Sequence, residues 1–494
     1  MKKASIFFIT TAAVLITGCG KYLEKEPDNR AKLTDPKKVS QLLASAYPLA
    51  NYMAFTEAMS DNADDKGQGQ VEPTNQSPYL FENVQTTDQD SPDNYWNECY
   101  KAIAAANEGL AACDKAANPD EYKKQRGEAL IARAYAHYML VTLYAKPYDV
   151  ATAGTNPGVP YVTEPETVVI KQYERHTVAY VYDMIEKDLL AGLPLIDDAA
   201  YDKVKYHFNR SASNAFAARF YLSKRDYAKV VQYATASVPN FLPNLRPWNT
   251  TYQTYGINNL PAQYQRTSEA ANLLLVSCPT LYNYGLSYVV YRYALSNDKM
   301  DEILDNSISV TGGSWSFILG YVGSQSNPAI PKLNYTDFVY ETPTSNFGVG
   351  YGVISLFTTE EVLFNKAEAN TYLGNYDAAI NDLNIYMSTR ITGATPGALA
   401  PARQITEAKV LAHYNGTLPI KEALVAYILE LKRAEYIHEG MRWFDMLRYN
   451  IPVKHDINNG GTTGTSITID ANDKRRQLKL PDGVKLSGIT DLNR

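Results

Sequence analysis

Apolar residues recur every three or four positions over several long stretches of the chain, which is the spacing of one buried face of a helix. Three such stretches cover residues 93–116, 120–144 and 177–193. Thr177 is the expected N-cap of the third helix, and Pro194 stands just beyond its end. The pattern predicts long amphipathic helices throughout the first half of the chain.

Two stretches of the chain resemble each other. Residues 214–231 and 361–379 each contain a helix with small packing residues, then Tyr-Leu, a tight turn and a second helix. This arrangement resembles the tetratricopeptide helix-turn-helix unit, which buries its apolar face only by stacking on neighbours. The copies are few and widely separated, so we expect scattered helix pairs with long insertions and not a regular solenoid.

The insertions are irregular. Residues 239–353 are rich in Asn, Pro, Gly, Tyr and Ser, show weak helical periodicity and are too aromatic for a disordered segment. A shorter irregular stretch covers residues 56–92, and residues 466–470 and 477–480 are expected to pair as short strands. The predicted fold is mostly α, with tetratricopeptide-like helix pairs as a scaffold, a long loop-rich lobe and minor β hairpins.

The first residues predict export. Lys2 and Lys3 precede an apolar run over residues 6–16, which is far short of the ~20 residues of a membrane-spanning helix. The run ends at Cys19, and residues 16–19 resemble a bacterial lipobox, whose cysteine is acylated. An ordinary cleavable signal with an incidental cysteine is the alternative. The expected divisions are a signal peptide over residues 1–18, a lipidated tether over residues 19–30 and one domain over residues 31–494.

The composition is that of a globular protein. The 494 residues are 45% hydrophobic and 20% charged, with a formal net charge of −6. This mild acidity gives no basic surface for nucleic acid, so no nucleic-acid partner is expected. Cys99 and Cys113 lie on one predicted helix, about 21 Å apart, which is too far for a disulfide. We expect these two thiols and Cys278 to be buried and free, although a bridge to Cys278 stays open.

Tyrosine is unusually abundant, with 39 Tyr against 14 Phe and 4 Trp. A tyrosine is apolar along its ring and polar at its tip, so it suits half-buried packing and wet binding surfaces. The excess favours a recognition protein.

Four segments, taken in order, resemble the SusD/RagB family of outer-membrane lipoproteins, named after the starch-utilisation system of Bacteroidetes. They are the lipidated start at residues 19–27, residues 96–107, residues 126–160, and the run of residues 433–448 with its acidic-Gly-x-Arg-Trp-Phe-Asp-x-x-Arg pattern. The resemblance implies a helical, non-catalytic protein anchored by Cys19 to outer-membrane lipid at the cell surface. It also implies an oligosaccharide ligand and a SusC-like TonB-dependent transporter as partner, with no cofactor.

The resemblance further implies a site where aromatic faces stack on sugar rings and polar groups bind hydroxyls. Trp96, at the start of a helix, and Trp315, in a Gly-Gly-Ser-Trp-Ser-Phe loop, are the main candidates. The weaker candidates are Tyr282, Tyr284, Tyr288 and Tyr321. The alternative for each is an aromatic packed in the core.

The run over residues 433–448 also has a structural interpretation. Its charged residues are spaced three or four apart, so opposite charges are expected to face each other along helices and stabilise the fold. Gly440 permits a bend or a close contact, and direct ligand contact is the alternative role. The charged members are Glu435, Glu439, Arg442, Asp445 and Arg448.

The sequence contains no Gly-x-Ser-x-Gly elbow, His-Glu-x-x-His motif or phosphate-binding loop, so binding is expected and not catalysis. Asp61, Asp64 and Asp65 fit no calcium loop, and a solvated acidic turn is the favoured interpretation. Three alternatives stay open: a peptide or another nutrient as ligand, a surface glycan hydrolase using two carboxylates, and a non-catalytic subunit that organises the transporter.

Overall fold

The computed structural model describes residues 33–168, 170–459 and 462–493. The predicted signal peptide, the tether and Cys19 lie outside the described residues. Within these ranges helices are the predominant secondary structure, as predicted, and no helix is both long and apolar enough to cross a membrane.

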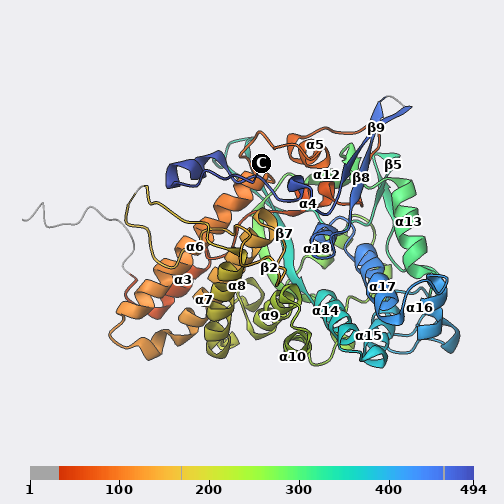
Figure 1. Cartoon of the computed structure of the whole chain (residues 1–494), viewed down its shortest axis with the longest axis horizontal. Coiled ribbons are helices and arrows are strands. Elements are labelled where there is room, and N and C mark those ends of the chain that lie inside the picture. Colours follow the sequence, from red (N-terminus) through yellow and green to blue (C-terminus); the bar gives the residue numbers. More distant parts are fainter. Residues whose placement is uncertain (1–32, 169, 460–461, 494) are drawn as a thin grey trace, which may run out of the picture.

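The first helices form a layer of antiparallel neighbours, seen on the left of Figure 1. Thr177 caps the last of them, as predicted, because its side chain accepts a hydrogen bond from the Tyr180 N–H at 3.2 Å. The helices of this layer are α3 (Pro36–Leu43), α6 (Pro92–Lys115), α7 (Lys123–Tyr144) and α8 (Val178–Gly192), whereas α4 (Met53–Met59) and α5 (Pro73–Tyr79) lie above and to the right of it in Figure 1.

The two self-similar stretches are helix pairs, as the sequence predicts. They are α9 (Arg210–Lys224) with α10 (Tyr227–Ser237), and α14 (Thr359–Tyr372) with α15 (Tyr376–Ser388). Arg225 takes a left-handed conformation in the first turn, and Gly374 does so in the second. The pairs pack together through α10 and α14, so two segments far apart in sequence form one scaffold along the lower edge of Figure 1.

The lobe over residues 239–353 is built from short elements joined by loops. Strands β2, β7 and β6 form an antiparallel sheet in the order β2-β7-β6, and β7 runs directly into α14. The elements are α11 (Leu260–Tyr264), β2 (Asn272–Pro279), α12 (Ser287–Val290), β3 (Tyr293–Ala294), α13 (Asn297–Ile308), β4 (Gly320–Val322), β5 (Ser324–Ala329), β6 (Tyr335–Tyr340) and β7 (Gly348–Thr358). Strand β3 pairs with β1 (Asp64–Asp65), and β4 pairs with β5.

The C-terminal part adds α16 (Glu407–His413), α17 (Ile420–Glu435) and α18 (Met441–Arg448) to the scaffold. A hairpin of β8 (Val453–Asn459) and β9 (Thr462–Ile469) follows and projects beyond α5 and β5 in Figure 1. The expected pairing of residues 466–470 with 477–480 is therefore wrong. Residues 453–459 pair with the first of these segments, and residues 477–480 run without strand structure beside α6.

The C-terminal run of charges joins separate elements more than it stabilises single helices. Glu435 and Arg390 form two hydrogen bonds, at 2.9 and 3.1 Å, and a second Arg390 contact reaches Glu360 at 3.0 Å. Glu360 in turn binds Arg246 of the lobe at 2.7 Å. All four side chains are fully buried. Burial alone would raise the pKa of Glu435, but the charge and hydrogen bonds of Arg390 outweigh it and hold that pKa below its ordinary value.

The remaining members of the run also reach other elements. Among them, the expected pairing along one helix occurs between Asp445 and Arg448, at 3.0 Å. The other contacts are Glu439 with Lys332, Arg442 with Asp61, Asp445 with Lys432, and Arg448 with Glu368. The prediction of pairs along the helices is corrected accordingly, because the partners come from α14, α17, the lobe and the segment just after α4.

Gly440 makes the close contact that the sequence predicts, because α4 leaves no room for a side chain at this position. Its φ is +69°, and a Cβ built there would lie 2.2 Å from the Thr56 hydroxyl and 2.9 Å from the Met53 Cα. The Glu57 carboxylate accepts hydrogen bonds from the Gly440 and His438 N–H groups at 2.9 and 3.0 Å. Burial raises the pKa of Glu57 to about 7, although these hydrogen bonds act to lower it. The thiols of Cys99, Cys113 and Cys278 are buried and free, as predicted.

Candidate ligand-binding site

Three of the aromatic residues predicted to bind ligand are buried in the core. Trp96 packs against Tyr144 and Tyr100, with ring centroids 4.9 and 5.0 Å away. Tyr282 and Tyr288 are buried, and their hydroxyls donate to the carbonyls of His438 and Leu333. The expectation that these three residues stack on a ligand is corrected, because core packing covers their ring faces.

Trp315 is half-buried. Its indole N–H donates to the Leu304 carbonyl at 2.9 Å, and Phe317 stacks on one ring face at 4.8 Å. Its backbone bridges to Ile391, which follows the scaffold helix α15. Trp315 is therefore fixed where the lobe meets the scaffold.

Tyr321 and Tyr284 are the predicted residues whose rings are exposed, at 57% and 59% of their surface. Tyr321 lies in the short β4–β5 hairpin. Tyr284 follows β2, and its ring contacts that of Tyr335 on β6 at 5.0 Å. Of the six predicted aromatics, Tyr284 is the one that the structure joins to further exposed rings.

Those rings form a continuous row along the β6–β7 hairpin. Tyr335 neighbours Phe338 at 6.5 Å, and Phe338 neighbours Tyr340 at 4.9 Å. Phe338 and Tyr340 stand opposite Gly350 and Gly348 on β7, so they share one face of the hairpin. We call Tyr284, Tyr335, Phe338 and Tyr340 the aromatic row.

Glycines on β7 allow the rings to lie flat. A Cβ at Gly350 would lie 2.0 Å from the Tyr335 ring, and one at Gly348 would lie 2.6 Å from the Phe338 ring. The absence of side chains at these positions leaves room for the rings to cover the strand. Phe338 and Tyr340 remain 37% and 56% exposed, so the row offers ring faces and edges to solvent.

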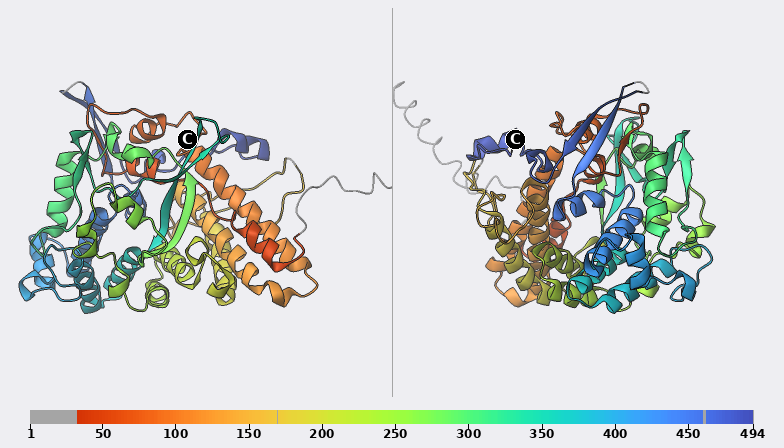
Figure 2. Two further views of the ribbon diagram at one scale, coloured as in Figure 1. Left: turned by 180° about the vertical axis from the view of Figure 1, so that it is seen from behind. Right: turned by 45° about the vertical axis from the view of Figure 1, so that its right-hand side comes forward.

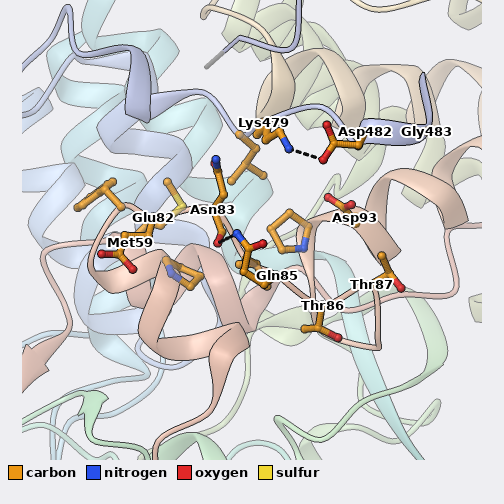
Figure 3. Close-up of a pocket in the computed structure, with 15 residues that line it drawn as sticks. Met59, Glu82, Asn83, Gln85, Thr86, Thr87, Asp93, Lys479, Asp482 and Gly483 are labelled. Carbon is orange, nitrogen blue, oxygen red and sulfur yellow. Dashed lines mark hydrogen bonds and ion pairs between the residues drawn. The ribbon is translucent and has the colours of Figure 1, made fainter. Parts of the chain in front are cut away.

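A polar pocket of about 260 Å³ lies on the same side of the molecule, where α6 begins (Figure 3). Its walls come from residues 82–87 and from the C-terminal segment, which provides the Lys479–Asp482 ion pair at 2.7 Å. The labelled polar residues are Glu82, Asn83, Gln85, Thr86, Thr87, Asp93, Lys479 and Asp482. Amide, hydroxyl and charged groups in one concave site suit a ligand with many hydroxyls.

Asp93 and Asp482 of this pocket have shifted pKa values. Burial raises the pKa of Asp93, with Asp482 adding to the rise and Lys479 opposing it. Hydrogen bonds from Lys479 and Lys485 lower the pKa of Asp482 to about 2. At neutral pH Asp482 is ionised and paired.

Asp90 connects the pocket to the aromatic row. Its carboxylate accepts hydrogen bonds from the Leu281 and Tyr282 N–H groups at 2.6 and 3.0 Å. Tyr282 is two residues before Tyr284, while Asp90 lies between the pocket residues 82–87 and α6. Burial raises the pKa of Asp90 to about 6. The pocket and the row therefore belong to one surface, which we call the loop face.

Figures 1 and 2 place the loop face relative to the scaffold. The chain's C-terminal end and α5 lie along the upper edge, and α10 and α15 lie along the lower edge. Strand β7 runs between the two, from the hairpin to the start of α14.

The sequence prediction missed Tyr335, Phe338 and Tyr340. A signal was present, because Gly348, Gly350 and Gly352 alternate along a strand-forming segment and leave one face of it bare. The pairing that sets aromatic rings against those glycines joins positions 8 to 17 residues apart, and spacing alone does not reveal it.

The three aspartates considered as calcium ligands bind other side chains of the protein. Asp61 pairs with Arg442, Asp64 accepts from the Ser296 hydroxyl, and Asp65 pairs with Arg292. No cluster of His, Cys, Asp and Glu that could hold a metal ion occurs among the described residues.

Comparison with known proteins agrees with this fold. The family model SusD-like_3, described as "Starch-binding associating with outer membrane", matches residues 21–222. No curated protein sequence matches the chain.

Solved structures are similar over nearly the whole chain. A SusD-like carbohydrate-binding protein from Bacteroides vulgatus is 16% identical, with 92% of this chain and 96% of that one covered at a TM-score of 0.65. A SusD superfamily protein from Bacteroides fragilis is 17% identical, with 93% and 99% covered at 0.64. A laminarin-binding SusD-like protein is 16% identical, with 84% and 92% covered at 0.55. The family model over residues 21–222, together with the fold shared over nearly the whole chain, makes this protein similar to the SusD-like family.

Proposed function

We propose that this protein captures a neutral oligosaccharide on its loop face, with the aromatic row as the stacking platform and the polar pocket as the site for hydroxyl groups. The observation that carries the proposal is the row itself, in which the Tyr284 ring continues the line of three rings on the β6–β7 hairpin, and all but the half-buried Tyr335 are exposed. Aromatic faces stack on the C–H faces of sugar rings, and several rings in line suit a chain of sugars.

The pocket supplies complementary chemistry. Asn83, Gln85 and Thr86 offer amide and hydroxyl groups, while the charge of Lys479 is neutralised by Asp482. Glu82 and Asp93 add further carboxylates to the lining, and this excess of negative charge favours a neutral ligand over an acidic one. The structural similarity to a laminarin-binding SusD-like protein also supports a glycan as the ligand.

The finer parts of the proposal follow the family. Acyl chains on Cys19 would hold the protein at the outer-membrane surface, and a SusC-like TonB-dependent transporter would receive the captured oligosaccharide. The step is binding and release, without bond cleavage. Co-purification of the full chain with such a transporter tests this partnership.

A panel of polysaccharides should be titrated against the full chain, purified in detergent, and against the double variant Tyr284→Ala/Tyr340→Ala. We expect saturable binding of one polysaccharide, with a dissociation constant raised at least about tenfold in the variant, since each lost ring contact contributes on the order of 1 kcal/mol. Tyr180→Ala is the matched control, because Tyr180 is an exposed tyrosine on scaffold helix α8.

Other results would favour the alternatives. Binding that is lost with Trp315→Ala and kept in the double variant would move the platform to the β4 side of the lobe. Binding of peptides and of no glycan would support a peptide ligand. Release of reducing ends that Asp93→Asn abolishes would identify a hydrolase, and co-purification without any ligand would support an organising subunit.

A further inference from the structure

A second pocket lies on the scaffold, apart from the loop face. It has a volume of about 230 Å³ and shares no lining residue with the polar pocket. It forms where the two helix pairs meet, because Leu222 and Ser223 come from the end of α9, Arg225 from the turn that follows, and Tyr372 from the end of α14. The C-terminal helix α18 and the residues after it close the pocket with Phe444, Arg448, Tyr449 and Asn450.

Tyrosine rings dominate the walls. Tyr227 and Tyr372, one from each helix pair, are stacked at 4.2 Å with an angle of 2° between their planes. Tyr148 and Tyr182 form another pair at 4.6 Å. Such walls offer flat apolar faces with polar tips, as sites for sugar rings do.

The polar groups of the pocket are balanced in charge. Glu368 holds Arg448 by two hydrogen bonds at 2.8 and 2.9 Å, and Asp445 adds a third at 3.0 Å. Asp445 also pairs with Lys432 behind the wall, and Arg225, the other charged residue of the lining, pairs with Asp149 at 4.0 Å, so three positive and three negative groups stand in or beside the pocket. A pocket with no net charge gives no advantage to an anionic ligand.

Arg448 is fixed and still accessible. Its side chain is 20% exposed although Glu368 grips it in a planar, bidentate arrangement. Asn450, an exposed residue with φ +52°, presents an amide at the rim. A rigid guanidinium and an amide are donors that suit the hydroxyls of a sugar.

We propose that this scaffold pocket is a second binding site, for a single neutral pyranose ring. The size limits the ligand, because the volume falls below the roughly 300–1,000 Å³ of pockets for larger molecules. The site is independent of the proposed function of the loop face, since the two pockets have separate walls, and Figure 1 shows helices α9, α10 and α14 of the scaffold away from the upper edge.

The test uses methyl glycosides of glucose, galactose, mannose and xylose as probes, with saturation-transfer NMR on the full chain in detergent. One ring fills the pocket, so monosaccharides are sufficient. We expect saturable binding of at least one probe, weakened about tenfold by Tyr227→Ala, which removes one of the stacked rings. Tyr284→Ala, on the loop face, should leave this binding unchanged.

Asn450→Asp is a second variant, because it changes an exposed amide to a carboxylate at a position whose backbone Asp tolerates. It should also weaken binding, and it decides the matter if Tyr227→Ala does not fold. Failure of all four probes to bind, or binding that survives both scaffold variants, would overturn the proposal. Binding lost only with Tyr284→Ala would assign the probe to the loop face. Polysaccharide binding on the loop face should persist in both scaffold variants, so the two proposals can fail separately.

Discussion

The scaffold and the loop face use polar and aromatic residues in opposite ways. In the scaffold, charged groups such as Arg390 and Glu435 are fully buried and bound to each other. On the loop face, large rings such as Tyr284 and Tyr340 stand in solvent. Buried charges fix how elements meet because any other arrangement leaves a charge unpaired, whereas exposed rings stabilise the fold little and remain available for a ligand.

This difference predicts which property a substitution in each region should change. Changes in the scaffold should alter the free energy of unfolding with little direct effect on the ligand surface. Changes on the loop face should alter binding and leave unfolding nearly unchanged. Four substitutions test this division, from the largest expected effect to the smallest.

Glu435→Ala should lower the free energy of unfolding by about 3–5 kcal/mol, because it leaves Arg390 buried without its main partner. Guanidinium titration measures the loss. The double variant Arg390→Met/Glu435→Leu should recover much of it, since neither charge then remains. A loss below about 1 kcal/mol in the single variant would show that the buried network does not govern scaffold stability.

Acidification should act on the scaffold through Glu57. Its pKa is raised by burial from 4.5 to about 7, so the folded state binds the proton more tightly than the unfolded state. This group therefore stabilises the fold as the pH falls from 7 to 4.5, by about 3 kcal/mol in total, and the contribution is absent above pH 7. Unfolding measured across this range should show a steeper dependence in the wild type than in Glu57→Gln. Equal slopes in the two proteins would refute the assignment.

Gly440→Ala should cost about 1–3 kcal/mol of stability, because the residue has a left-handed backbone conformation and touches α4. Gly154→Ala is the matched control, since Gly154 has an ordinary φ and no atom lies within 4 Å of its added Cβ. Thermal unfolding compares the two. A similar change in both variants would mean that the contact of α18 with α4 tolerates a side chain.

Tyr340→Ala should change the free energy of unfolding by less than about 0.5 kcal/mol, because the ring is more than half exposed. Its effect should be seen in binding, as a weaker affinity for the polysaccharide that the full chain binds. If Tyr340→Ala were strongly destabilised and its affinity for the polysaccharide unchanged, the aromatic row would have a structural role, and the proposed difference between the two regions would be wrong.

The scaffold was largely predictable from sequence and the loop face was not. Helix periodicity and the repeated Tyr-Leu turn locate α6 to α10, α14 and α15 because those signals arise from neighbours within a few residues. The pairing partners of Glu435 and Arg442 come from residues 45 and 381 positions away, so their spacing suggested contacts along one helix that the fold does not make. Trp96 was misassigned because an aromatic at a helix start has the same pattern whether it faces ligand or core.

The pairing of strand β7 with β2 over only part of its length determines how the β6–β7 hairpin is held. Its inner half, from Tyr351 to Thr358, pairs with β2, and Thr358 caps α14. Its outer half, beyond Tyr351, pairs with β6 alone. The hairpin is therefore a two-stranded arm attached to the scaffold at one end, and the end of β2 is where we expect it to hinge. Phe338 and Tyr340 lie beyond that hinge on the same two-stranded arm, so a displacement of the tip carries both rings together and keeps their spacing.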